Sequence, residues 1–224
     1  MTPSACTFYG GGHRGTESEF GRLAEQFGVN EINYSFEGHQ PARERGLKVL
    51  TPEELKKGDI SMEIVSMRMQ RKYAHANKIR KVFQAIFHMV NSGLQIFAVG
   101  WIQPDDTVKG GTGWAVELGK LFNRPVSVFD QDKNQWFTWT ENAWKADAPR
   151  IVHETFVGTG TRNLTDAGTQ AIADLFQRSF DWSQQRRAVD TLRRFVRPAV
   201  YPSVAPPRSR CPPAGNMQQR GKSA

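Results

Sequence analysis

The stretch Cys6-Thr7-Phe8-Tyr9-Gly10-Gly11-Gly12-His13-Arg14-Gly15-Thr16-Glu17 decides the fold, because a short apolar run passes through four glycines into a helical pattern. Apolar residues recur at helical spacing from there to Gly28, and Thr16 with Glu19 has the form of an N-terminal capping box. Glycine lets backbone N–H groups approach an anion closely, and a helix N-terminus contributes roughly half a positive charge. The stretch predicts a strand, a phosphate-binding turn and a helix.

A second glycine turn follows residues 94–100, an apolar run typical of a central strand buried on both faces. The turn Lys109-Gly110-Gly111-Thr112-Gly113-Trp114-Ala115-Val116-Glu117 opens a predicted helix that ends near Phe122, and residues 126–129 follow as a strand. A third turn, within residues 154–162, separates a strand from a helix predicted over residues 165–180. This alternation favours an α/β fold, a three-layer Rossmann-like parallel sheet with helices on both faces.

The segments between these units carry weaker patterns. Residues 31–36 are predicted to form the second strand, and residues 135–139 alternate as the return strand of a hairpin. Thr51-Pro52-Glu53-Glu54 has the form of a helix start, and residues 71–90 show the pattern of a long, basic amphipathic helix. The polar segment 38–50 is predicted to be a loop over the ligand-binding edge.

The formal net charge of +8 belongs to one end of the chain. Residues 186–224 carry nine basic side chains and one acidic side chain, whereas residues 1–185 carry 21 of each sign. The basic segment also holds six prolines, a composition that cannot bury enough apolar surface to fold alone. The sequence predicts one domain over residues 1–185 and a mostly disordered tail over residues 186–224. Two alternatives stay open for this tail. It contacts nucleic acid or an acidic partner, or it is a solvated tail without a dedicated partner.

Several functional classes lack their sequence signals. Cys6 and Cys211 stand far apart, so no disulfide framework is expected, and no apolar run reaches the roughly 18 residues of a membrane span. The five histidines lack the spacing of a zinc site, and neither a Walker A sequence nor a Gly-x-Ser-x-Gly elbow occurs. We expect a cytoplasmic protein without a membrane segment, metal or cofactor, and the basic tail leaves nuclear import open.

The three glycine turns together resemble the SLOG superfamily, the Rossmann-like group that contains the LOG phosphoribohydrolases, the DprA proteins and the YpsA-like proteins. The resemblance covers roughly residues 5–180. It rests on residues 10–17, on Gly110-Gly111-Thr112-Gly113 with Glu117, and on Gly158-Thr159-Gly160-Thr161-Arg162-Asn163-Leu164-Thr165. The resemblance implies binding of a nucleotide or a nucleotide-derived ligand. The superfamily includes enzymes that hydrolyse the N-glycosidic bond of a nucleoside 5′-monophosphate, so the resemblance also implies this activity.

The resemblance also implies site residues. LOG-type enzymes carry Pro-Gly-Gly-x-Gly-Thr-x-x-Glu in the second loop, and here Lys109 replaces the Pro and Trp114 replaces the Thr. Glu117 matches the glutamate that assists glycosidic cleavage, because a carboxylate stabilises the developing positive charge on the ribose. The family's second catalytic residue is an arginine on a preceding helix. Arg71 and Arg80 are both candidates for it, and we name Arg80 with Glu117 as the predicted catalytic residues. The predicted ligand- and phosphate-binding residues are Gly10, Gly11, Gly12, Arg14, Gly15, Thr16, Gly110, Gly111, Thr112, Gly113 and Trp114.

Other functions remain open from the residues alone. Gly10-x-Gly12-x-x-Gly15 is formally a dinucleotide fingerprint, and Glu37 stands 22 residues beyond Gly15 near the end of the second predicted strand. A non-catalytic sensor of a nucleotide or dinucleotide derivative, or a cofactor carrier, is the alternative to an enzyme. DNA binding would need a basic face on the domain, and the neutral charge of residues 1–185 argues against it. The resemblance makes a homodimer plausible.

Overall fold

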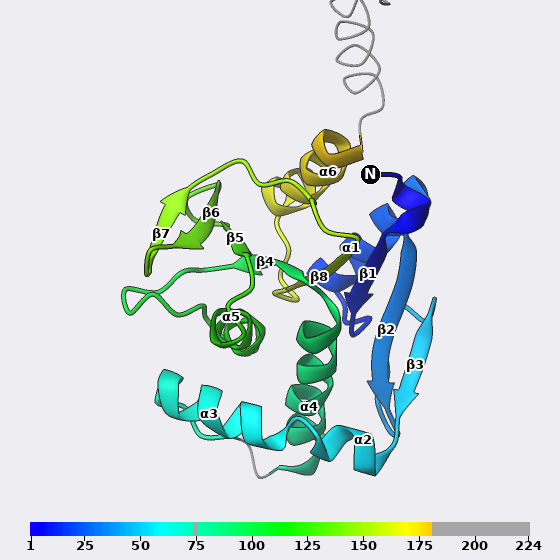
Figure 1. Ribbon diagram of the computed structural model, residues 1–224, viewed down its shortest axis with the longest axis vertical. Coiled ribbons are helices and arrows are strands. Elements are labelled where there is room, and N and C mark those ends of the chain that lie inside the picture. Colours follow the sequence, from blue (N-terminus) through cyan, green and yellow to red (C-terminus); the bar gives the residue numbers. More distant parts are fainter. Residues whose placement is uncertain (74–75, 181–224) are drawn as a thin grey trace, which may run out of the picture. The chain divides into compact units, whose positions relative to one another are not determined.

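An eight-stranded sheet organises the chain, in a computed structural model that describes residues 1–73 and 76–180. The spatial order of the strands is β3-β2-β1-β8-β4-β5-β6-β7, and the pairing is parallel from β3 through to β5 (Figure 1). The antiparallel hairpin β6–β7 extends the far edge. The strands are β1 (Thr7–Gly10), β2 (Asn30–Phe36), β3 (Leu47–Leu50), β4 (Gln95–Gly100), β5 (Val126–Asp130), β6 (Gln135–Thr140), β7 (Ala143–Ala146) and β8 (Thr155–Gly160).

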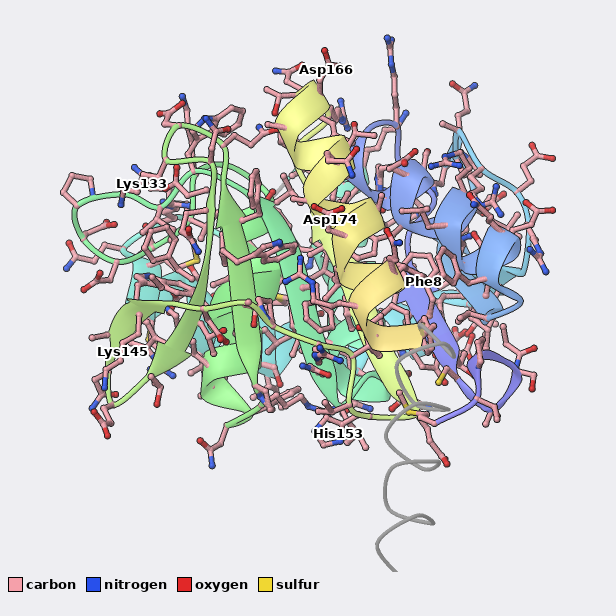
Figure 2. All side chains as sticks on the ribbon, turned by 90° about the horizontal axis from the view of Figure 1, so that it is seen from above. Phe8, Lys133, Lys145, His153, Asp166 and Asp174 are labelled. Carbon is pink, nitrogen blue, oxygen red and sulfur yellow. The ribbon has the colours of Figure 1, made fainter. Side chains whose placement is uncertain are left out.

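Helices cover both faces of the sheet, as the sequence predicts. In Figure 1, α6 lies on one side of the sheet and α3, α4 and α5 lie on the other, and Figure 2 shows α1 beside α6. The two faces enclose separate apolar clusters, one around Phe20 and Phe176 and the other around Met62 and Met89. The helices are η1 (Pro3–Ala5), α1 (Thr16–Phe27), α2 (Pro52–Lys56), α3 (Asp59–Met69), α4 (Asn77–Ser92), α5 (Thr112–Leu121) and α6 (Asp166–Phe180).

The central strands owe their place to apolar runs. All six residues of β4 are buried, which confirms the prediction of a central strand. Gly158 in β8 shows how closely a helix approaches the sheet, because an added Cβ would lie 2.3 Å from the Phe20 ring of α1. The third turn is therefore predicted too early, since Gly158 and Gly160 belong to the strand and not to the loop after it.

Three other predictions need correction. The Thr16–Glu19 capping box is wrong, because Gly15 is the N-cap and Thr16 instead donates a hydrogen bond to the carbonyl oxygen of Thr161 at 2.9 Å. The capping box that does form is at the predicted helix start, where Thr51 pairs with Glu54. The segment 38–50 contains strand β3, and α3 and β7 are additional elements that the sequence does not predict. The helix predicted over residues 71–90 begins later, at Asn77.

The described residues all belong to one compact unit. None of the helices in this part of the chain combines the length and the apolar character needed to cross a membrane. The basic tail predicted over residues 186–224 lies outside the described residues.

Candidate functional site

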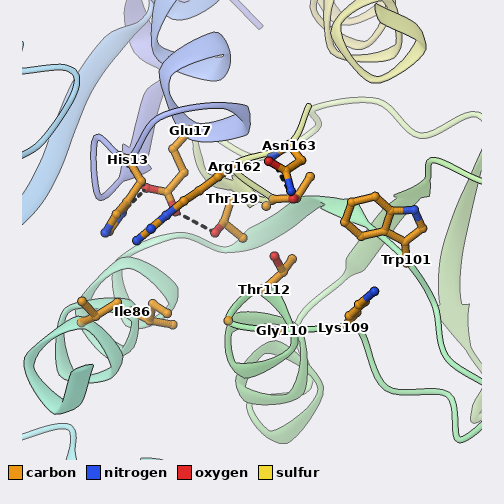
Figure 3. Close-up of a pocket in the computed structure, with 14 residues that line it drawn as sticks. His13, Glu17, Ile86, Trp101, Lys109, Gly110, Thr112, Thr159, Arg162 and Asn163 are labelled. Atoms are coloured by element: carbon orange, nitrogen blue, oxygen red, sulfur yellow. Dashed lines mark hydrogen bonds and ion pairs between the residues drawn. The ribbon is translucent and has the colours of Figure 1, made fainter. Parts of the chain in front are cut away.

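A cleft of about 450 Å³ opens at the carboxyl edge of the parallel strands (Figure 3). The loops after β1 and β8 form one side of it, and the N-terminus of α5 faces them. Open α/β sheets bind ligands at this edge, and the volume lies within the range of about 300–1,000 Å³ of small-molecule sites. The lining residues are His13, Glu17, Val82, Ile86, Trp101, Lys109, Gly110, Gly111, Thr112, Thr159, Gly160, Thr161, Arg162 and Asn163.

The first glycine loop is filled by a side chain of its own helix. The Glu17 carboxylate turns back into the loop, where Oε2 accepts hydrogen bonds from the amides of Gly11 and His13, both at 3.1 Å. The same oxygen accepts a hydrogen bond from His13 Nδ1 at 2.9 Å, and Oε1 accepts one from Thr159 Oγ1 at 2.9 Å. Two of the amides that a phosphate would use are therefore already bonded to a carboxylate.

Glu17 and His13 form an ion pair at the floor of the cleft. Burial by itself raises the pKa of the Glu17 carboxyl, but the charge and hydrogen bonds of His13 and the hydrogen bond from Thr159 outweigh it and lower the pKa below its usual value. Burial by itself lowers the pKa of His13, and the neighbouring carboxylate outweighs this effect and raises it. The cleft thus contains an ionised carboxylate that binds the Nδ1 edge of an imidazole ring.

This pair predicts a pH-dependent difference in stability between the wild type and His13→Gln. The contribution of Glu17 is complete above its unfolded-state pKa of 4.5 and is lost as the pH falls through the lowered folded-state pKa. The contribution of His13 is complete below its unfolded-state pKa of 6.5 and is lost as the pH rises through the raised folded-state pKa. We expect the difference in free energy of unfolding to be largest between pH 4.5 and 6.5 and to decline on both sides.

Chemical denaturation at pH values from 4 to 9 measures this difference, each pH being set to within about 0.1 unit. His153→Gln is the control, because His153 forms no ion pair with another described residue. A difference for His13→Gln that stays constant over this range would contradict the ion pair.

The second glycine loop presents free backbone donors to the cleft. Gly111 is the N-cap of α5, and among the described residues none accepts a hydrogen bond from the amides of Gly110, Gly111 or Thr112. A Cβ added at Gly110 or Gly111 would meet no atom within 4 Å, so both glycines face open space. The ammonium group of Lys109 lies 5.6 Å from the centre of the Trp101 ring at the same wall of the cleft. This wall therefore combines a helix N-terminus with a lysine that forms no ion pair with another described residue.

Arg71 stabilises the second loop through hydrogen bonds to its backbone. Its guanidinium donates hydrogen bonds to the carbonyl oxygens of Val108 and Gly110, at 3.2 and 3.4 Å. The other terminal nitrogen donates to the side chains of Gln103 at 2.6 Å and Thr107 at 3.0 Å. Of the two arginines that the sequence left open, Arg71 is thus the one that contacts this loop.

Comparisons with models of protein families, with curated proteins and with solved structures found no match. The chemistry of the cleft therefore rests on its own residues. Among the described residues, no group of three histidine, cysteine, aspartate or glutamate side chains could hold a metal ion.

The two residues predicted to be catalytic lie away from the cleft lining. Glu117 is buried on α5, where its carboxylate pairs with Lys120 Nζ at 2.8 Å. The ammonium group of Lys120 lies 3.6 Å from the centre of the Trp139 ring, so this pair faces the β6–β7 hairpin. Arg80 lies in the first turn of α4, where it pairs with Asp59 at 2.9 Å and is not among the residues that line the cleft.

The predicted binding residues divide between the two loops. Gly110, Gly111 and Thr112 line the cleft, whereas Gly113 and Trp114 are buried within α5 and the Trp114 ring stacks on Phe83. In the first loop, Gly15 packs against the backbone of Arg162 and is held at φ 89°, a conformation that favours glycine. Gly10 ends β1, and the Gly11 amide donates to Glu17. The carbonyl oxygen of Gly12 accepts hydrogen bonds from the segment after β2, and Thr16 donates one to the loop after β8. Arg14 lines a neighbouring cavity.

Sequence reasoning missed the residues that β8 brings to the cleft. Thr159 lies in a buried strand between β1 and β4, and Arg162 and Asn163 follow at its carboxyl end. Their position in the third motif, directly after a predicted strand, was a signal that could have selected them. Glu17 also had a positional signal, because it stands within the first turn of a helix that follows a glycine loop.

Proposed function

We propose that the cleft binds a nucleoside 5′-monophosphate, or a ligand derived from one, with its phosphate at the N-terminus of α5. The observation that carries this proposal is that the amides of Gly110, Gly111 and Thr112 have no acceptor among the described residues, and that these three residues line a cleft of about 450 Å³. Backbone N–H groups and the helix dipole favour a phosphate there, and Lys109 adds a positive charge. The resemblance of the second loop to LOG-type loops supports the same position.

The rest of the cleft suits the other parts of a nucleotide. Val82 and Ile86 of α4 supply an apolar wall, and Trp101 supplies an aromatic ring whose indole nitrogen is already bonded to Asp132 at 2.9 Å. Such surfaces accept the faces of a base or a sugar, while polar groups fix orientation. Thr159 and Asn163 are the polar groups near the floor and the rim.

Hydrolysis of the N-glycosidic bond is the reaction favoured by the position of Glu17. Glu17 is the acidic side chain among the described residues that line the cleft, and its lowered pKa keeps it ionised. In this reaction water adds to C1′ as the C1′–N bond breaks, and an ionised carboxylate stabilises the positive charge on the ribose. We assign that role to Glu17 in place of Glu117. A binding protein without turnover, such as a sensor or a carrier, would use the same phosphate contacts.

Gly111→Ala tests the phosphate site with little cost to the fold. The added Cβ meets no protein atom, and Gly111 already has helical backbone angles of φ −64° and ψ −30°. The methyl group would occupy the space next to the amides, so we expect the affinity for nucleoside 5′-monophosphates to fall at least about tenfold, or about 1.4 kcal/mol. Titration calorimetry with the four ribonucleoside 5′-monophosphates, and chromatography for released base, measure binding and turnover.

The matching nucleosides are the control for this variant. Because they lack the phosphate, Gly111→Ala should change their affinity by less than about twofold. Equal weakening of nucleosides and monophosphates would place the phosphate elsewhere, and no binding of any monophosphate by the wild type would remove the proposal.

A further inference from the structure

A second cavity of about 510 Å³ adjoins the nucleotide cleft on the side of the first glycine loop. Three residues, His13, Arg162 and Asn163, line both spaces, so the two spaces adjoin at these side chains. The residues that line the second cavity alone are Arg14, Gln40 and Ala42. We call this space the outer cavity.

The outer cavity is cationic. Arg14 and Arg162 both line it, and neither forms an ion pair with another described residue. No acidic residue is among those that line it. The carboxylate of Glu17, which lines the adjoining nucleotide cleft, is engaged by two amides, by His13 and by Thr159. Two guanidinium groups without a carboxylate form a binding surface for an anion, because planar guanidinium groups donate paired hydrogen bonds to phosphate oxygens.

The walls of the outer cavity are fixed in place. The amides of Ala42 and Arg43 donate hydrogen bonds to the carbonyl oxygen of Gly12, at 2.8 and 3.1 Å, which fastens the segment after β2 to the first loop. The side chain of Arg43 then binds Glu31 Oε1 at 2.6 Å. A cavity with fixed walls loses little conformational freedom when a ligand binds.

His13, which lines both spaces, packs against a second histidine. The rings of His13 and His39 lie with their centres 4.6 Å apart. Burial, together with the charge of His13, lowers the pKa of His39 to about 4, so His39 is neutral near pH 7. The positive charge at this point therefore comes from Arg14, Arg162 and the His13 of the ion pair.

We propose that the outer cavity binds a second phosphate of the same ligand, so that the ligand class is a nucleotide with two phosphate groups. This inference rests on the proposed function, because the first phosphate is the one at the N-terminus of α5. That helix end lines the nucleotide cleft and Arg14 lines the outer cavity, while His13 lines both spaces. Because the helix end and Arg14 line different spaces, a ligand whose ribose lies over His13 would present one phosphate to each space.

Arg14→Gln separates the two phosphate sites, because Arg14 lines the outer cavity and does not line the nucleotide cleft. The full chain is titrated with nucleoside 5′-monophosphates and with nucleoside 3′,5′-bisphosphates, whose two phosphates lie on either side of one ribose. We expect at least one of the two-phosphate ligands to bind the wild type about tenfold more tightly than its monophosphate. Arg14→Gln should remove most of that advantage and leave monophosphate affinity within about twofold.

Arg22→Gln is the matched control, since Arg22 is an exposed arginine of α1 that pairs with Glu19 outside both cavities. It should leave every affinity unchanged. Equal affinity of the wild type for mono- and two-phosphate ligands would overturn the inference while leaving the proposed function intact. Weakening of all ligands alike by Arg14→Gln would also overturn it. Failure of every ligand to bind, monophosphates included, would remove the proposed function itself.

Discussion

Replacement of Arg43 by methionine is expected to lower the free energy of unfolding by about 3 kcal/mol. The Glu31 side chain is fully buried, and the Arg43 guanidinium binds both of its oxygens, at 2.6 and 2.7 Å. Removal of one partner of a buried pair leaves the other charge without compensation, which costs more than the pair contributes. The amide of Asn33, at 2.7 Å, would be the main remaining donor to that carboxylate.

Thermal unfolding measures this effect, and a loss of 3 kcal/mol corresponds to a fall in Tm of about 6 to 12 °C for a chain of this size. Arg22→Met is the control, because the Arg22–Glu19 pair is exposed and such pairs contribute about 1 kcal/mol or less. Equal, small shifts for both variants would contradict the buried role of the Arg43–Glu31 pair. The same pair anchors the wall of the outer cavity, so the variant should also weaken any ligand held there.

Glu17→Gln is expected to reduce glycosidic turnover by about a hundredfold or more. Glutamine keeps the size of the side chain but loses the negative charge that the reaction requires at C1′. It also places an NH₂ group against donors, since the Gly11 amide, the His13 amide and Thr159 all donate to this side chain. Some loss of stability should therefore accompany the loss of activity, and melting temperatures of the variants have to be recorded with the rates.

Glu117→Gln is the matched control for the assignment. Both glutamates are buried on a helix that follows a glycine loop, but Glu117 pairs with Lys120 and lies outside the cleft lining. Turnover should survive in Glu117→Gln and be lost in Glu17→Gln. The reverse pattern would return the catalytic role to the residue that the resemblance selected. Thr159→Val, which removes one hydrogen bond to Glu17 without changing its charge, should reduce turnover less than Glu17→Gln does.

The sequence predicts most of the fold because its strongest signals are local. The glycine turns, the helical spacing up to Gly28 and the apolar run of β4 each specify an element from a few neighbouring residues. Strand β3 has no such signal, since Leu47 and Val49 are exposed on an edge strand and its register comes from pairing with β2. Helix α3 is also hidden from periodicity, because Ile60 and Met67 are exposed on the face opposite its buried residues.

The site is harder to predict because side-chain direction depends on the tertiary structure. Glu17 turns back to the amides of its own loop, and Glu117 turns toward Lys120 and the hairpin, yet both have the same local sequence context. Thr159 reaches Glu17 only because β8 is inserted between β1 and β4. Sequence analysis predicts a phosphate site at the second loop, but it cannot show that the first loop is already filled by a carboxylate.

The most direct test of the central proposal is a titration of ¹⁵N-labelled protein with nucleoside 5′-monophosphates, followed by the backbone amide resonances. The account predicts saturable shifts for the amides of Gly110, Gly111 and Thr112, which have no acceptor in the described part of the chain, and smaller shifts with the nucleosides. The amide of Gly11, already bonded to Glu17, should move least among the loop glycines. Shifts confined to the first loop, or none at the start of α5, would contradict the proposed phosphate site.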